Sequence, residues 1–176
     1  LFSSVDLIFL IIIGGLWGSF ANVCIVRMPQ DKGVVAGRSN CPKCKKQINW
    51  YDNIPIISYF ILNGKCRKCK KPISFRYVVV ELLSIISFVV IYLIYGFSFT
   101  TLLLFILSLG FIIIFFIDLK HFIIPDAITF PLMVLGFIKS FIPNLDPIFP
   151  YYVLSLIGGV FGYGIIWGII FFYKQV

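Results

Sequence analysis

Residues 97–117 read FSFTTLLLFILSLGFIIIFFI, a run of 21 positions without a charged side chain. The hydrocarbon core of a bilayer is ~30 Å thick, and a helix that crosses it needs ~20 mostly apolar residues. The run has that length, so it predicts a transmembrane helix. It decides the fold class because a soluble domain of this size has too small an interior to hide such a helix.

Four further apolar runs cover most of the remaining chain, at residues 7–26, 78–95, 123–142 and 151–173. The chain of 176 residues is 60% hydrophobic and only 12% charged, a composition that indicates lipid as the main solvent. The first run is too long to be a signal-peptide core, and the Pro and Asn residues at 143–147 indicate a turn. We therefore predict an all-α, polytopic membrane helix bundle of about five helices. Its predicted parts are a first helix within 1–26, a loop domain at 27–77 and the remaining bundle at 78–176.

The basic residues are concentrated in the predicted loop domain. Of the 15 Lys and Arg residues, 12 lie between Arg27 and Arg76, and the positive-inside rule places such a loop in the cytoplasm. Successive helices then return Lys120, His121 and Lys174 to the same face, and Lys139 is the one exception. Because topology already accounts for these charges, we expect no nucleic-acid partner.

Four of the five cysteines form two C-x-x-C pairs, Cys41-Pro-Lys-Cys44 and Cys66-Arg-Lys-Cys69, with 21 residues between them. This spacing lets four thiolates surround one tetrahedral ion, so it predicts a zinc-ribbon-like site for zinc or a similar structural metal. The basic side chains around the pairs are expected to lower the thiol pKa values. A dithiol redox module is the alternative, which a reducing cytoplasm disfavours. Cys24, in the first apolar run, is interpreted as a small buried apolar residue.

Three carboxylates stand out in the predicted bundle. Asp118 directly follows an apolar run, so it is either a functional membrane carboxylate or a residue that reaches water at the helix end. Asp126 follows Pro125 and is interpreted as a structural, capping residue of the next helix. On a continuous helix the two would be separated by ~12 Å of rise, too far to share a proton. Glu81 is expected to face the bundle, near Arg76 or a polar pocket.

Three pairs of glycines have the small-residue spacing that favours close helix packing. The pairs are Gly14 with Gly18, Gly158 with Gly162, and Gly164 with Gly168.

Several motifs, in order, resemble those of the type IV prepilin peptidase family. They read GSFANVCIVRMP (18–29), RSNCPKC (38–44), WYDNIPIISY (50–59), NGKCRKC (63–69), RYVVVELL (76–83) and DLKHFIIPDAIT (118–129).

The resemblance implies an intramembrane aspartic endopeptidase of the bacterial inner membrane. Such an enzyme removes the leader from type IV prepilin-like proteins and N-methylates the new N-terminus with S-adenosylmethionine. The family's first catalytic aspartate corresponds to Asp118. Gly18, Asn22 and Arg27 are candidates for the S-adenosylmethionine site.

The family's second aspartate belongs to a G-x-G-D motif, and this sequence has none, since Gly162-Tyr-Gly164 is followed by Ile165. We therefore expect an N-terminal part of such an enzyme that does not cleave by itself. The other functional hypotheses are a non-catalytic zinc-ribbon assembly protein of the membrane and a membrane dithiol redox protein. The sequence indicates no particular oligomeric state.

Overall fold

The computed structural model describes residues 3–35, 39–41, 43–142 and 152–173. The predicted turn at 143–147, Arg38 and Lys174 lie outside these residues. The described chain is helical, and its only β-type pairings are two isolated antiparallel bridges, Asn40 with Gln47 and Lys65 with Pro72. It forms two compact units, Leu1–Thr129 and Phe130–Val176. The predicted all-α class is confirmed.

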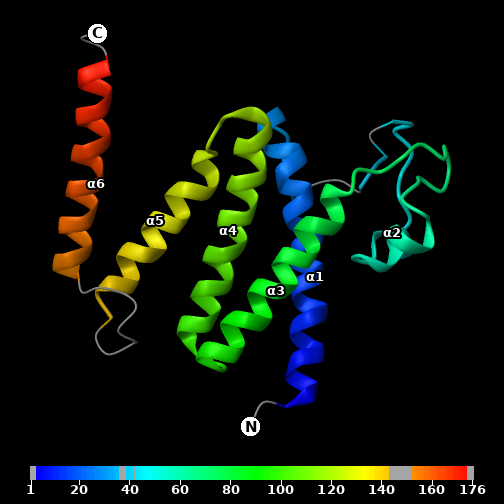
Figure 1. Cartoon of the computed structure of the whole chain (residues 1–176), viewed down its shortest axis with the longest axis horizontal. Coiled ribbons are helices and arrows are strands. Elements are labelled where there is room, and N and C mark those ends of the chain that lie inside the picture. The colour runs from blue at the N-terminus through cyan, green and yellow to red at the C-terminus, as the bar shows by residue number, and fades with distance from the viewer. Residues whose placement is uncertain (1–2, 36–38, 42, 143–151, 174–176) are drawn as a thin grey trace. The chain divides into compact units, whose positions relative to one another are not determined.

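Three helices of the first unit are long and apolar enough to cross a membrane, judged by length and composition among the described residues. They are α1 (Ser4–Arg27), α3 (Arg76–Tyr95) and α4 (Phe99–His121). The three lie side by side, and α1 packs most extensively on α3 (Figure 1).

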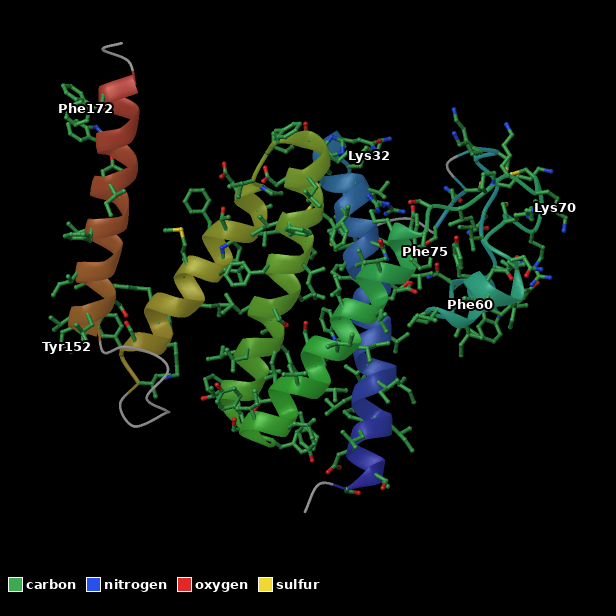
Figure 2. The ribbon with its side chains drawn as sticks, in the orientation of Figure 1. Lys32, Phe60, Lys70, Phe75, Tyr152 and Phe172 are labelled. Atoms are coloured by element: carbon green, nitrogen blue, oxygen red, sulfur yellow. The ribbon has the colours of Figure 1, made fainter. Side chains whose placement is uncertain are left out.

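The outward faces of these helices are as apolar as their contacts with one another. Ile11 of α1, Leu82 of α3 and Phe111 of α4 are 47%, 47% and 60% exposed. Water would be a poor solvent for so many large apolar side chains, whereas lipid tails suit them. Figure 2 shows such side chains projecting along the length of the helices. The chain is therefore a membrane protein.

Close contact between α1 and α3 depends on two glycines. A Cβ added to Gly14 would lie 2.9 Å from the Cα of Ile85, and one added to Gly18 would lie 2.7 Å from the Cα of Glu81. Both neighbours are backbone atoms, so neither can move aside cheaply. The predicted role of this glycine pair in packing is confirmed.

The other two predicted glycine pairs behave differently. In the described part of α6 (Tyr152–Tyr173), a Cβ added to any of these four glycines would meet nothing within 4 Å. Their spacing therefore makes no close helix contact among the described residues, and their role in helix packing stays a prediction.

A short turn joins α3 to α4. Gly96 has φ 61°, a left-handed conformation that glycine adopts without steric cost, and its N–H bonds the carbonyl of Tyr92 at 2.8 Å. The Ser98 hydroxyl then accepts from the N–H of Thr101 at 3.1 Å and caps α4. The predicted break at Gly96 is confirmed.

The far end of α4 lies beyond the predicted limit of residue 117. The helix continues to His121, and Phe122, with φ 54°, ends it by donating its N–H to the carbonyl of Asp118 at 2.9 Å. Asp118 thus lies inside the last turn of α4 instead of after it. His121 ends the helix and does not lie in the following turn.

The last two predicted runs also contain helices. α5 (Asp126–Ser140) starts after Pro125, which disfavours helical geometry in the residue before it, and is shorter than the predicted 123–142. α6 agrees closely with the predicted 151–173, and its described apolar stretch is Tyr152–Ile165.

The loop domain contains short helices that the sequence did not predict. They are η1 (Met28–Gln30), η2 (Trp50–Asn53) and α2 (Ile57–Ile61). Pro55, two residues before α2, lies against α1, because a Cβ on Gly15 would lie 3.2 Å from the Cβ of Pro55.

Candidate metal centre and membrane carboxylates

The four cysteines of the C-x-x-C pairs converge on one point. The sulfur atoms of Cys41, Cys44, Cys66 and Cys69 all lie within 4.8 Å of one another, and those of Cys41 and Cys69 are 3.9 Å apart. A tetrahedral zinc with bonds of ~2.3 Å requires sulfur atoms ~3.8 Å apart. The predicted cluster is therefore present, and it could hold a metal ion with little rearrangement.

The two cysteine pairs are built by the same backbone pattern. In the first, the N–H of Cys41 bonds the carbonyl of Lys46 at 3.0 Å, and the N–H of Lys45 bonds the carbonyl of Cys41 at 2.8 Å. The second repeats both bonds 25 positions later, from Cys66 to Lys71 and from Lys70 to Cys66, each at 2.9 Å.

The repeat includes the backbone conformation at the fourth position after the first cysteine of each pair. Lys45 and Lys70 both have a left-handed φ, of 56° and 59°. Two knuckles with the same geometry bring their thiols together, and this arrangement could hold one ion as a zinc ribbon does.

The two thiols of the second knuckle have pKa values shifted in opposite directions. Hydrogen bonds from the N–H groups of Cys69 and Lys68 lower the pKa of Cys66 to about 7. The N–H of Lys71 lowers the pKa of Cys69, but partial burial and the neighbouring thiols outweigh it and raise the value to about 11. The prediction that surrounding basic side chains lower the thiol pKa values is thus wrong for these two cysteines.

Arg67, one of those basic residues, instead forms an ion pair with a carboxylate. Its Nε and NH2 groups donate to Asp52 at 2.7–3.0 Å, a two-pronged ion pair that also raises the pKa of Arg67. The pair joins the second knuckle to η2, on the segment between the knuckles.

Glu81 is buried, at 7% exposure, where α3 meets α1. Its carboxylate accepts from the N–H of Ile56 at 2.7 Å and from the Ser19 hydroxyl. Its partners are therefore α1 and the residue before α2, and in the part of the chain that the structure describes no hydrogen bond or ion pair joins it to Arg76. Ile56 has φ 61° and ψ −54°, an uncommon conformation that this bond helps to hold.

Asp118 and Asp126 lie on two different helices with a short non-helical link between them. Asp118 is in the last turn of α4 and Asp126 is the first residue of α5. Both side chains are exposed, and among the described residues no hydrogen bond or ion pair engages either carboxylate. The ~12 Å spacing of a continuous helix does not apply, because the helix is interrupted.

The three residues considered for a cofactor site have different surroundings. Gly18 faces α3 at van der Waals distance. Asn22 is buried, and its amide nitrogen donates to the carbonyl of Tyr77 at 3.0 Å while its amide oxygen has no partner in the described chain. Arg27 donates to the carbonyl of Gly33 at 3.2 Å. Cys24 is buried at 2% exposure, as predicted.

Sequence reasoning missed Asp52 and Ser19, whose roles depend on long-range contacts. Asp52 lies five positions before the start of α2 and gave no spacing signal. Ser19 lies inside the motif at 18–29, next to Gly18. A search for polar side chains near the glycines of α1 that face α3 would have found it.

Two family models match the chain. The bacterial peptidase A24 N-terminal domain matches residues 12–95, and the type IV leader peptidase family matches residues 104–176. No solved structure is significantly similar to the chain.

Several curated relatives are named prepilin leader peptidase/N-methyltransferase. The protein of Myxococcus xanthus is 38% identical over 139 residues, which are 79% of this chain and 42% of the relative. That of Vibrio cholerae is 39% identical over 145 residues, 76% of this chain and 56% of the relative. That of Neisseria gonorrhoeae is 35% identical over 187 residues, 93% of this chain and 64% of the relative.

The chain thus spans between 42% and 64% of the length of these three relatives. The two family models follow one another along the chain, and the first contains all four clustered cysteines while the second contains Asp118. This chain belongs to the type IV prepilin leader peptidase family.

Proposed function

We propose that the protein containing this chain is a prepilin leader peptidase and N-methyltransferase of the bacterial inner membrane. Its substrates would be type IV prepilins or related pseudopilins. The observation that carries the proposal is the match to both family models in order, together with relatives of that name at 35–39% identity.

Asp118 is the proposed catalytic aspartate. Hydrolysis by an aspartic enzyme uses one carboxylate to activate water and a second to protonate the leaving amine. The last turn of α4 places the Asp118 carboxylate at the end of a membrane helix, exposed and next to Lys120 and His121. That position suits a substrate cut at the membrane face.

Asp126 retains the structural role proposed for it. It lies in the first turn of α5, where a negative side chain interacts favourably with the positive end of the helix dipole. The family's second aspartate has no counterpart in these 176 residues, so the test below uses the full coding sequence.

Zinc is the proposed ion of the four-cysteine cluster. Four thiolates at tetrahedral spacing suit zinc, which would hold the two knuckles together as a structural element. The loop domain that carries them is proposed to be cytoplasmic, because Lys and Arg accumulate there.

S-adenosylmethionine is the proposed methyl donor. Of the three candidate residues, Asn22 offers a buried amide oxygen free to accept a hydrogen bond, and Arg27 offers a guanidinium at the end of α1. Gly18 would contribute by letting α3 approach, which keeps Asn22 in place.

The test is prepilin processing in a strain without its own prepilin peptidase. Expression of the full coding sequence is expected to restore loss of the leader, seen as a mobility shift of the pilin. Asp118→Asn is expected to abolish the shift and Asp126→Asn only to weaken it. Lys120→Gln, in the same turn, is the matched control and should process normally. Full processing by Asp118→Asn would contradict the assignment.

A further inference from the structure

An apolar cluster is exposed on the segment between the two knuckles. Ile54, Ile57, Phe60 and Ile61 are 40%, 57%, 62% and 69% exposed. Burial of one such side chain contributes ~1.5–3 kcal/mol, so a cluster left in water would be a large loss of stability. Something apolar is therefore expected to cover it.

The cluster lies beside the membrane-spanning part of α1 and α3. Pro55 packs on Gly15, which is 12 positions, or ~18 Å, along the helix from Arg27 at the charged end of α1. The N–H of Ile56 bonds Glu81, which is 5 positions, or ~8 Å, along α3 from Arg76. Both anchors lie on helix stretches long and apolar enough to cross a membrane, Ser4–Gln30 and Arg76–Tyr95.

Backbone polar groups at that depth must be paired within the protein. The N–H of Ile56 donates to Glu81, and the Ser58 hydroxyl donates to the carbonyl of Tyr51. Other N–H groups bond carbonyls two to five positions earlier in the chain. These donors are Ile57, Ser58, Phe60, Leu62, Asn63 and Gly64. The backbone of this segment is thus suited to an apolar environment.

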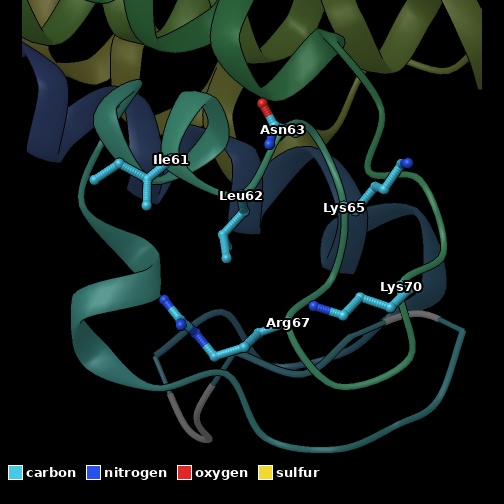
Figure 3. Close-up of a pocket in the computed structure, with 6 residues that line it drawn as sticks. All are labelled: Ile61, Leu62, Asn63, Lys65, Arg67 and Lys70. Carbon is cyan, nitrogen blue, oxygen red and sulfur yellow. The ribbon is translucent and has the colours of Figure 1, made fainter.

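The residues that flank the segment have interfacial character. Trp50 and Tyr51 precede it, at 81% and 44% exposure, and aromatic residues of this kind concentrate at bilayer surfaces. After it, an open hollow of about 420 Å³ is lined by Ile61, Leu62, Asn63, Lys65, Arg67 and Lys70. Figure 3 shows Ile61 and Leu62 on one side of this hollow and Arg67 and Lys70 on the other. Basic side chains near apolar ones suit the level of phospholipid headgroups.

We propose that residues 54–62 form a re-entrant segment, which enters the bilayer from the side of the cysteine loop and turns back. Phospholipid acyl chains cover Ile57, Phe60 and Ile61. Lipid is favoured over a protein partner because the segment packs on the same helices whose outer faces are apolar throughout. The inference needs α1 and α3 to span a membrane, and it does not depend on the proposed enzymatic activity.

The test places a photoreactive benzoylphenylalanine at position 60 of the chain, reconstituted in vesicles of phosphatidylcholine and phosphatidylglycerol. After irradiation, mass spectrometry measures the fraction of chain joined to phospholipid. Position 111, on the outer face of α4, is the positive control, and position 35, where Val35 is 91% exposed in the loop, is the water-exposed control. The near-isosteric probe at Phe60 is chosen to preserve the fold.

Lipid adducts are expected in similar yield at positions 60 and 111. At position 35 no lipid adduct is expected. The same probe at Ile57 should also give lipid adducts, which guards against a local distortion at one site. Yields at 57 and 60 as low as at 35 would overturn the proposal. Crosslinks from position 60 to a second copy of the chain, in place of lipid, would also overturn it.

Discussion

Cys66 and Cys69 belong to one knuckle, yet their environments shift their pKa values in opposite directions. The value for Cys66 is lowered to about 7 by two backbone N–H groups, and that for Cys69 is raised to about 11. In one knuckle, the Cys66 thiol therefore loses its proton readily, whereas the Cys69 thiol keeps its proton until metal binding displaces it.

Alkylation of the metal-free protein tests this difference. At pH 8 iodoacetamide is expected to modify Cys66 well before Cys69, since the thiolate is the reactive form. Peptide mass spectrometry measures the two rates, with buried Cys24 as an unreactive internal control. Equal rates at the two positions would contradict the assignment.

The same shifts give the pH dependence of the metal-free loop. The lowered pKa of Cys66 contributes stability that is complete above pH 9 and is lost as the pH falls through about 7. The raised pKa of Cys69 contributes stability that is complete below pH 9 and is lost as the pH rises through about 11.

At the scale of secondary-structure elements, the contact between α1 and α3 depends on the absence of side chains at Gly14 and Gly18. Gly18→Ala is expected to lower the free energy of unfolding by about 1–3 kcal/mol, because its Cβ would lie 2.7 Å from backbone. Thermal unfolding in detergent, followed by circular dichroism, measures the change.

Gly159→Ala is the matched control for that substitution. It also replaces a helical glycine, but its Cβ would meet nothing within 4 Å, so stability should be unchanged or slightly higher. If both variants melt at the temperature of the parent, the close contact is not important for stability.

The long helices could be predicted because each contains a long, mostly apolar run, and Gly96 marks the end of one of them. The last turn of α4 could not, since Asp118 and its polar neighbours extend the helix beyond the apolar run. α2 was missed because a short apolar segment fits a helix and a strand equally well. The bond that holds Ile56, the residue before α2, comes from Glu81 of α3, which is 25 positions away.

The metal cluster could be predicted from spacing alone, because C-x-x-C geometry is local. The ion pair of Asp52 with Arg67 could not, since it joins residues 15 positions apart and nothing in the sequence selects one Asp–Arg pairing. The same holds for the opposite pKa shifts of Cys66 and Cys69, because the backbone N–H groups that lower the first and the burial and neighbouring thiols that raise the second depend on the folded loop.

At the scale of the whole molecule, the loop domain and the membrane helices depend on different interactions. The knuckles have a few backbone bonds and four thiols, whereas α1, α3 and α4 pack on one another. Removal of the metal is therefore expected to make the loop open more often and to leave the helices folded.

Elemental analysis of purified protein should give about one zinc per chain. Treatment with a zinc chelator should increase trypsin cleavage within the lysine-rich knuckles while the far-ultraviolet circular dichroism of the helices is retained. Cys41→Ser should reproduce this state, and Cys24→Ala, outside the cluster, should keep its metal. A protein without metal and with disulfides within the two pairs would support the redox alternative instead.

The repeated knuckles have a consequence for how the segment between them can vary. Once the ion joins Cys44 to Cys66, the 21 intervening residues form a closed loop with fixed ends. The entropy of closing such a loop grows only logarithmically, by ~0.6 kcal/mol for each doubling of its length. Insertions of a few residues on either side of Ile56, which Glu81 holds, therefore cost little closure free energy, so the length of this segment can vary while Cys44 and Cys66 stay at the metal centre.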